Sequence, residues 1–343
     1  MNKPVGRGVV VILLLGLAVT GCARKPPEAG PVSGPSPSRP APAGPLAGKR
    51  IGVSLLNKQH VFYQDLERAM RDAAAKEGCE LIVESAEFDS KLQDDQVDNF
   101  IVQKVDAMVL CPADSASVVG AIEKANAAGI PVFTCDIAAH GGKVVAHIAS
   151  DNLQGGRLAA EYLAKLLKGK GKVLVIDHPS VESVQLRTKG FDEVMAKYPG
   201  IKVVAKQPAE GQRAKARDVM ENMLLAHPDL DGVFGINDDS ALGALAACRA
   251  HKGAEKIVIV GYDATPEAIG EILAGSQLKA DVAQFPYTMG VTTITTIRRY
   301  FAGEKVGGFV PIPVQILDKP ALEDLKAQGK LKQINGQWTL VQE

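Results

Sequence analysis

The chain has 343 residues, more than one ordinary hydrophobic core contains, so two domains are expected in its folded part. Hydrophobic residues make up 46% and charged residues 23%, a composition typical of a globular protein. The 39 Lys and Arg residues balance the 39 Asp and Glu residues, which excludes the basic footprint of a nucleic-acid-binding domain.

Residues 1–22 have the pattern of an export signal. Lys3 and Arg7 form a positive start, and residues 9–19 are apolar but too short for a permanent membrane span. The segment ends in Gly21-Cys22, and small residues before a cysteine resemble a bacterial lipobox. We therefore expect Cys22 to be the lipid attachment site; the alternative is an ordinary signal peptide with an incidental cysteine.

Residues 23–47 predict a linker. This stretch holds eight prolines among Gly, Ser and Ala and has no apolar periodicity. Such a segment is a semi-extended spacer, rising about 3.1 Å per residue where it is polyproline-like. The folded part is expected to be exported and held at a membrane by this tether.

From residue 48 onward, short apolar runs alternate with helical patterns. Strands are expected at 51–56, 80–83, 107–110, 131–134, 144–149, 173–176, 202–205, 233–236, 257–260, 278–282 and 310–317. Helices are expected at 62–76, 94–103, 116–128, 157–167, 184–197, 213–226, 241–251, 266–274 and 286–301. This alternation predicts an α/β fold of two lobes, each with a parallel sheet covered by helices on both faces.

The chain is expected to cross between the two lobes more than once. Residues 48–150 and 285–313 are assigned to the N-terminal lobe, and residues 151–284 and 314–343 to the C-terminal lobe. No functional argument is made for the tail that begins at Lys319.

Polar side chains come directly after several of the predicted strands. In an open α/β sheet a ligand binds at this place, outside the carboxyl ends of the strands. Asp136, Asn237 and Asp263 are each the first such residue after a strand. Carboxylates and amides can hold adjacent hydroxyls, and the rings of Phe62 and Tyr63 can cover the CH face of a sugar. The alternative is that such residues only cap helices, which is our interpretation for Asp114, Asp151 and Asp239.

Patterns for catalysis are scarce. The sequence has no G-x-S-x-G elbow, no H-E-x-x-H motif and no P-loop ending in Gly-Lys-Ser/Thr. His60 and His178 lie on loops at the expected ligand edge, where either a ligand contact or a surface position is open. Neither enzyme activity, a cofactor nor a metal is expected.

Several segments resemble the type I periplasmic sugar-binding proteins, most nearly the ribose-binding branch. They are VAHIASDN (145–152), VFGINDDSALGAL (233–245), VGYDATP (260–266) and Ala283-Gln284, and the similarity extends over residues 48–318. The resemblance implies two Rossmann-like lobes joined by a three-crossing hinge near residues 150, 284 and 313. It also implies a set of sugar ligands: Asp136, Asn237, Asp263, Gln284, Phe62 and Tyr63.

The chain departs from the ribose pattern at four places. Ile137 stands where an arginine usually follows the first-lobe aspartate, and Gln185 stands for a second arginine, with Arg187 two residues on. Gly211 replaces an aromatic residue. The first loop is about two residues longer and contributes Lys58 and His60. Lys58, His60, Gln185 and Arg187 therefore join the candidate ligand-binding residues, and a neutral ligand such as a hexose, a deoxy-sugar or a substituted sugar is expected rather than ribose.

The sequence thus predicts the solute-binding component of an ABC importer for a monosaccharide or similar small polyol, closing on its ligand by a hinge. Its expected partners are the sugar, the transmembrane permease and the membrane that holds its lipid anchor; the protein is expected to be a monomer. A receptor for a nucleoside or signalling furanose, or a sensory subunit, is the alternative. A related sugar-sensing repressor would need a DNA-binding segment before Gly48. An extracellular α/β enzyme is kept open mainly by His60, His178 and the acidic loops.

Overall fold

The computed structural model describes residues 44–341. The expected signal peptide, the lipid attachment site Cys22 and most of the predicted linker lie outside the described residues. The end of that linker was placed too late, because Leu46 is fully buried in the main hydrophobic core. Among residues 44–341, no helix combines the length and apolar character that crossing a membrane requires.

The first lobe is built on a six-stranded, all-parallel sheet with the order β11-β5-β4-β3-β1-β2. Its strands are β1 (Arg50–Leu55), β2 (Glu80–Ser85), β3 (Ala107–Leu110), β4 (Val132–Cys135), β5 (Val144–Ser150) and β11 (Phe309–Ile312). Its helices are α1 (Val61–Glu77), α2 (Ser90–Val102), α3 (Val118–Ala127) and α9 (Pro286–Phe301). Every residue of β3 and β4 is buried, as expected for parallel strands covered on both faces.

The second lobe repeats this plan, with the order β12-β10-β9-β8-β6-β7. Its strands are β6 (Lys170–Asp177), β7 (Gly200–Pro208), β8 (Gly232–Gly235), β9 (Val258–Asp263), β10 (Leu278–Ala283) and β12 (Gln315–Asp318). Its helices are α4 (Asn152–Leu166), α5 (Glu182–Met195), α6 (Arg213–Ala226), α7 (Asp238–Ala250) and α8 (Pro266–Leu273). The fold class predicted from the sequence, two α/β lobes built on parallel sheets, is therefore confirmed, with β12 as the one antiparallel strand of the two sheets as described.

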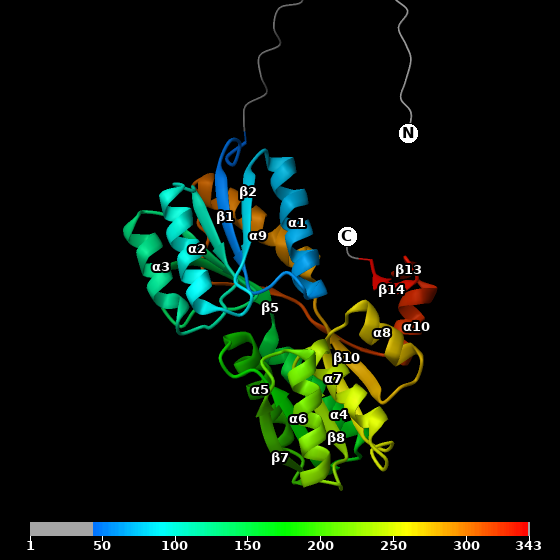
Figure 1. The fold of residues 1–343 in the computed structure, drawn as a ribbon. Coiled ribbons are helices and arrows are strands. Elements are labelled where there is room, and N and C mark those ends of the chain that lie inside the picture. The colour runs from blue at the N-terminus through cyan, green and yellow to red at the C-terminus, as the bar shows by residue number, and fades with distance from the viewer. Residues whose placement is uncertain (1–43, 342–343) are drawn as a thin grey trace, which may run out of the picture. The chain divides into compact units, whose positions relative to one another are not determined.

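The chain passes between the two sheets three times: after β5, after β10, and between β11 and β12. Figure 1 shows the result of the second crossing, with the orange α9 lying among the blue and cyan elements of the first lobe. The single strand predicted over 310–317 is wrong. Pro313 interrupts it, so β11 pairs in parallel with β5 in one sheet and β12 pairs antiparallel with β10 in the other.

The tail after β12 forms helix α10 (Lys319–Ala327) and a hairpin of β13 (Leu331–Ile334) and β14 (Gln337–Leu340). Asp318 caps α10 by accepting a hydrogen bond from the backbone of Ala321. Trp338 packs against the second-lobe core, and the Lys326 ammonium lies 4.5 Å from the centre of its ring. The tail is thus part of the second lobe (Figure 1).

Helices α4 and α5 approach each other closely at glycines. A Cβ added to Gly156 would lie 1.9 Å from the carbonyl oxygen of Arg187, and one added to Gly190 would lie 2.1 Å from that of Leu153. Backbone atoms cannot yield as a flexible side chain can. The contact places the backbone of Arg187 directly behind the cleft described below.

Gly156→Ala is expected to destabilise the protein by about 1–3 kcal/mol or more, because overpacking forces two helix backbones apart. Urea unfolding followed by circular dichroism would measure the change. Gly120→Ala in α3 is the matched control, since nothing lies within 4 Å of its added Cβ. There the helix propensity of alanine should raise stability by about 0.5–1 kcal/mol. Equal stability of the two variants would contradict the packing argument.

Candidate functional site

A cavity of about 610 Å³ lies at the carboxyl ends of the strands of both sheets. Its volume falls in the range of small-molecule sites, roughly 300–1,000 Å³. Both lobes line it, the first through the loops after β1, β2 and β4 and the second through the loops after β6, β7, β8 and β9. Eight predicted ligand-binding residues lie on its wall: His60, Phe62, Tyr63, Asp136, Arg187, Asn237, Asp263 and Gln284.

Asp136 is the first-lobe carboxylate of this cavity. It follows the fourth strand, β4, is almost completely buried, and has a positive φ of 66°. The hydroxyl of Tyr63 donates a hydrogen bond of 2.6 Å to its Oδ2. Burial raises the pKa of Asp136 to about 6, although the Tyr63 hydrogen bond and the charge of Arg187 oppose the rise. Tyr63 thus orients this carboxylate rather than only offering a ring.

Asp263 occupies the equivalent place in the second lobe, as the last residue of that lobe's fourth strand, β9. Its φ of 122° lies in a region that L-residues seldom adopt. Gln284 donates a 2.7 Å hydrogen bond to its Oδ1 and in turn accepts one of 2.7 Å from the Ser150 hydroxyl. Ser150 and Gln284 stand on two of the segments that cross between lobes, so the hinge itself holds this carboxylate. Burial raises the pKa of Asp263.

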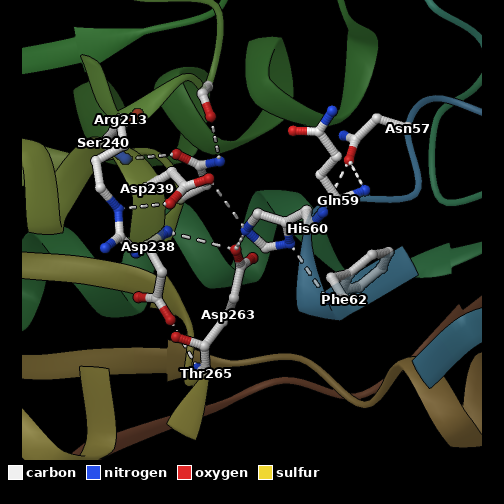
Figure 2. Close-up of polar contacts among 12 residues, drawn as sticks. Asn57, Gln59, His60, Phe62, Arg213, Asp238, Asp239, Ser240, Asp263 and Thr265 are labelled. Atoms are coloured by element: carbon white, nitrogen blue, oxygen red, sulfur yellow. Dashed lines mark hydrogen bonds and ion pairs between the residues drawn. The ribbon is translucent and has the colours of Figure 1, made fainter. Parts of the chain in front are cut away.

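His60 links the lobes across the cavity (Figure 2). Its Nδ1 accepts a 3.2 Å hydrogen bond from the backbone N–H of Phe62 and so caps helix α1. In the neutral ring the proton therefore resides on Nε2. That nitrogen lies 3.5 Å from Oδ2 of Asp263 and 4.0 Å from Oδ2 of Asp239. A first-lobe imidazole thus faces two second-lobe carboxylates.

Arg187 is a buried cation on the cavity wall and is fixed from three sides. Its Nε donates to Asn152 Oδ1 at 2.8 Å, and its Nη1 donates to the carbonyl of Ile236 at 2.7 Å. The guanidinium carbon lies 3.8 Å from the centre of the Tyr262 ring. Among residues 44–341 nothing is hydrogen-bonded to Nη2. The cavity wall thus carries two carboxylates and a rigid guanidinium whose Nη2 is available as a donor. Such a set of acceptors and donors can hold adjacent hydroxyls.

Comparison with known proteins places the whole arrangement in one family. A model described as a periplasmic binding protein domain matches residues 51–305. The chain belongs to the periplasmic binding proteins. The ribose import binding protein RbsB of Bacillus subtilis (strain 168) is 34% identical, over 90% of this chain and 98% of its own length.

Two solved structures show the same fold. An ABC transporter solute-binding protein of Bacillus halodurans, crystallised with bound myo-inositol, is 31% identical and has a TM-score of 0.76 over 82% of this chain and 99% of its own. One from Agrobacterium vitis, with bound α-D-tagatopyranose, is 28% identical with a TM-score of 0.77 over 82% and 98%.

Two of the predicted ligand-binding residues of this periplasmic binding protein lie off the cavity wall. Lys58 points its ammonium to the carbonyl of Val83 at 3.0 Å, and Gln185 donates to the carbonyl of Pro179 at 2.8 Å. Gln185 and Arg187 share helix α5, where a separation of two residues turns the side chain to about the opposite face. The structure therefore places the guanidinium of Arg187 on the cavity wall and the side chain of Gln185 off it.

Other wall residues were missed or assigned a different role. Asp239 was interpreted as a cap, but Asn237 caps α7 by accepting from Ser240 N, and Asp239 faces the cavity with Arg213 Nε 2.9 Å from its Oδ1. The surface alternative for the two histidines is also wrong, since the side chain of His60 is 13% exposed and His178 is 6% exposed. Cavity residues that were not among the candidate ligands include Leu56, Asn57, Gln59, Glu87, Phe88, Val181, Ser183, Val184, Gln212, Arg213, Ile236 and Asp239.

Beneath Asp263 lies a buried pair of carboxyl groups, Asp238 and Asp281. Burial is the largest cause that raises the pKa of Asp238, to about 6, and it raises that of Asp281 well above its usual range. Asp238 Oδ1 and Asp281 Oδ2 have no donor among the described residues, and a proton shared between the two groups satisfies both. Their other oxygens accept from the backbone of Thr265 and Ala264, so the pair fixes the loop that carries Asp263.

Proposed function

We propose that this protein is the extracytoplasmic solute-binding component of an ABC importer and that it binds a neutral sugar or small polyol between its lobes. The observation that carries the proposal is that two buried carboxylates, Asp136 and Asp263, face one cavity from opposite lobes. Arg187 lies on the same wall, and its positive charge lowers the pKa of both groups. Ionised carboxylates accept hydrogen bonds from hydroxyls but repel an anionic ligand. The ribose, D-apiose and xylitol named for relatives, and the myo-inositol and tagatose bound in neighbours, support this class.

A thermal-shift screen across pentoses, hexoses, cyclic polyols and nucleosides tests the proposal. A ligand at 100 times its dissociation constant should stabilise the native state by about 2.7 kcal/mol. We expect at least one sugar or polyol to do so. Stabilisation by nucleosides alone would favour the alternative receptor function, and no stabilisation by any of these compounds would contradict the proposal.

Binding is proposed to close the lobes about the three crossings. Support comes from direct contacts across the cleft: the Ser115 N–H donates to the carbonyl of Ser180 at 3.1 Å, and the Ser115 hydroxyl accepts from Glu182 N at 2.9 Å. Small-angle scattering should give a smaller radius of gyration with a saturating sugar than without it. An identical profile at saturation would argue against hinge closure.

We also propose that Cys22 carries a lipid that anchors the exported protein to the membrane. The support is the apolar segment that ends in Gly21-Cys22 and the proline-rich stretch that follows it. Cys22→Ser should leave an uncleaved precursor or release the protein from membranes on fractionation. A wild-type protein that is wholly soluble, with no lipid on Cys22 by mass spectrometry, would exclude the anchor.

Sugar affinity is expected to fall about tenfold between pH 8 and pH 5. The pKa of Asp136 is raised to about 6, so acidification protonates the free carboxylate that the ligand's hydroxyls need, and at pH 5 roughly one molecule in ten is still ionised. Calorimetric titration over this range measures the effect. Asp136→Asn should bind more weakly and with a smaller pH dependence, because burial also raises the pKa of Asp263 on the same wall; an undiminished pH dependence in that variant would assign it to another group.

A further inference from the structure

His178 lines the cleft, and its ring has no partner among the residues that the structure describes. It follows β6, is 6% exposed, and stands on the cavity wall. Its backbone N–H donates to Asp177 Oδ1, but no residue between 44 and 341 forms a hydrogen bond or ion pair with either ring nitrogen. A ring on the cavity wall without a protein partner is available to hydrogen-bond a ligand or water.

The space in front of this ring is kept open by Gly211. Gly211 has a φ of +65°, and a Cβ added there would lie 3.6 Å from His178 Nδ1 and 3.1 Å from Asn237 Nδ2. The same Asn237 nitrogen donates to the Gly211 carbonyl at 3.1 Å, which holds the loop in place. A side chain at position 211 would therefore fill the space that the imidazole faces.

A second polar group of the cavity wall follows five residues later in the chain. Ser183, in the first turn of α5, is 3% exposed and lines the cavity, and no described residue bonds to its hydroxyl. Val181 and Val184 add apolar surface beside it. We call this region the His178 subsite, comprising His178, Val181, Ser183, Val184 and Gly211.

The subsite is polar but uncharged. Burial lowers the pKa of His178 to about 4, so its ring is neutral at pH 7 and offers one donor and one acceptor. Glu210, Lys215, Arg187 and Asp114 act on the ring through their charges, and their opposing effects do not outweigh burial. Such a wall suits a hydroxyl, which donates and accepts, and gives no charge to pair with a phosphate or a carboxylate.

We propose that the His178 subsite binds a hydroxymethyl group carried by the sugar ring, with the imidazole and the Ser183 hydroxyl as its hydrogen-bond partners. The ligand is then a neutral hexose-type ring rather than an unsubstituted pentose. This inference rests on the proposed function, since it names a part of the same cleft. His178 is distinct from the carboxylates and Arg187, which hold the ring hydroxyls.

Calorimetric titration with matched sugar pairs tests the subsite. D-glucose and D-xylose, D-galactose and L-arabinose, and D-allose and D-ribose differ in their pyranose forms only by the hydroxymethyl group. For the pair that fits the ring site, we expect the wild type to bind the larger sugar at least tenfold more tightly. His178→Ala should remove that preference and leave the pentose affinity within about threefold of wild type.

Two further variants keep the test sharp. His178→Gln retains one donor and one acceptor and should keep most of the preference, whereas His227→Ala, a histidine outside the cavity, should keep all of it. Unfolding midpoints without ligand would show that each variant is folded. Equal losses for both members of a pair in His178→Ala, or wild-type binding confined to compounds without a hydroxymethyl group, would overturn the subsite but leave the proposed function intact. Failure of every sugar and polyol to bind the wild type would overturn both.

Discussion

Asp263→Gly is expected to abolish measurable sugar binding while leaving the protein at least as stable as the wild type. Hydrogen bonds to a charged group contribute about 1.5–3 kcal/mol each, so a carboxylate that accepts two ligand hydroxyls accounts for roughly a hundredfold to ten-thousandfold in affinity. Glycine is chosen here because the φ of Asp263 is 122°, a backbone conformation that glycine adopts without strain. Removing the side chain relieves backbone strain of about 1–3 kcal/mol. It also removes the cost of burying a carboxylate.

The experiment pairs calorimetric titration with urea unfolding. Asp263→Ala should lose binding as well but should be less stable than Asp263→Gly, since its Cβ keeps the backbone strain. Asp114→Ala is the matched control: that aspartate only caps a turn through Ala116 N and Ser117 N and is not on the cavity wall. It should lose stability but not affinity. Affinity within tenfold of wild type in Asp263→Gly would remove this carboxylate from the site.

Arg187→Ala is expected to cost about 3–5 kcal/mol of folding stability and to eliminate binding. The side chain is 4% exposed, and its loss leaves Asn152 Oδ1 and the Ile236 carbonyl without their donor. It also removes the positive charge that lowers the pKa values of Asp136 and Asp263, so both carboxyl groups would become harder to ionise.

Arg187→Lys separates charge from geometry. Lysine keeps the positive charge but lacks the planar guanidinium that donates to both Asn152 and Ile236 and stacks on Tyr262. We therefore expect losses of stability and of affinity that are smaller than those of Arg187→Ala. Gln185→Ala on the same helix is the control, because its exposed side chain only reaches the carbonyl of Pro179 and should change stability by no more than about 0.5 kcal/mol. Unfolding free energies of Arg187→Ala and Gln185→Ala that agree within error would contradict the role given to Arg187.

Much of the fold was predictable because its physical signals are local. Buried parallel strands such as β3 are continuous apolar runs, and helices such as α6 and α9 begin and end at the residues their patterns indicate. The run 310–317 was misassigned because both halves have strand composition. Only the pairing of β11 with β5 and of β12 with β10 reveals that they belong to different sheets.

The candidate site was predictable where a polar residue directly follows a strand. Asp136 directly follows β4, Asp263 follows the strand predicted over 257–260 and is the last residue of β9, and the structure brings both to one cavity. Residues on a helix were harder to place, because position along the sequence does not show which face a side chain occupies. Arg187 and Gln185 were confused for that reason, and Asp239 was taken for a cap although Asn237 fills that role.

Other features depend on contacts between distant parts of the chain and leave no pattern in the sequence. The Asp238–Asp281 pair joins residues from α7 and β10. Glu87 and Phe88 reach the cavity from the loop after β2, where they have positive φ angles of 48° and 63°. Leu46 was assigned to the linker because its neighbours are Pro, Gly and Ala, yet it packs into the first-lobe core.

Calorimetric titration of the purified wild-type protein with the best sugar or polyol from the thermal-shift screen tests the central claim most directly. The two-lobed cleft with one carboxylate from each lobe predicts saturable binding of one ligand per chain, which the Asp136→Ala, Asp263→Gly double variant loses. No heat of binding with any neutral sugar or polyol, or wild-type affinity retained in that double variant, would contradict the account.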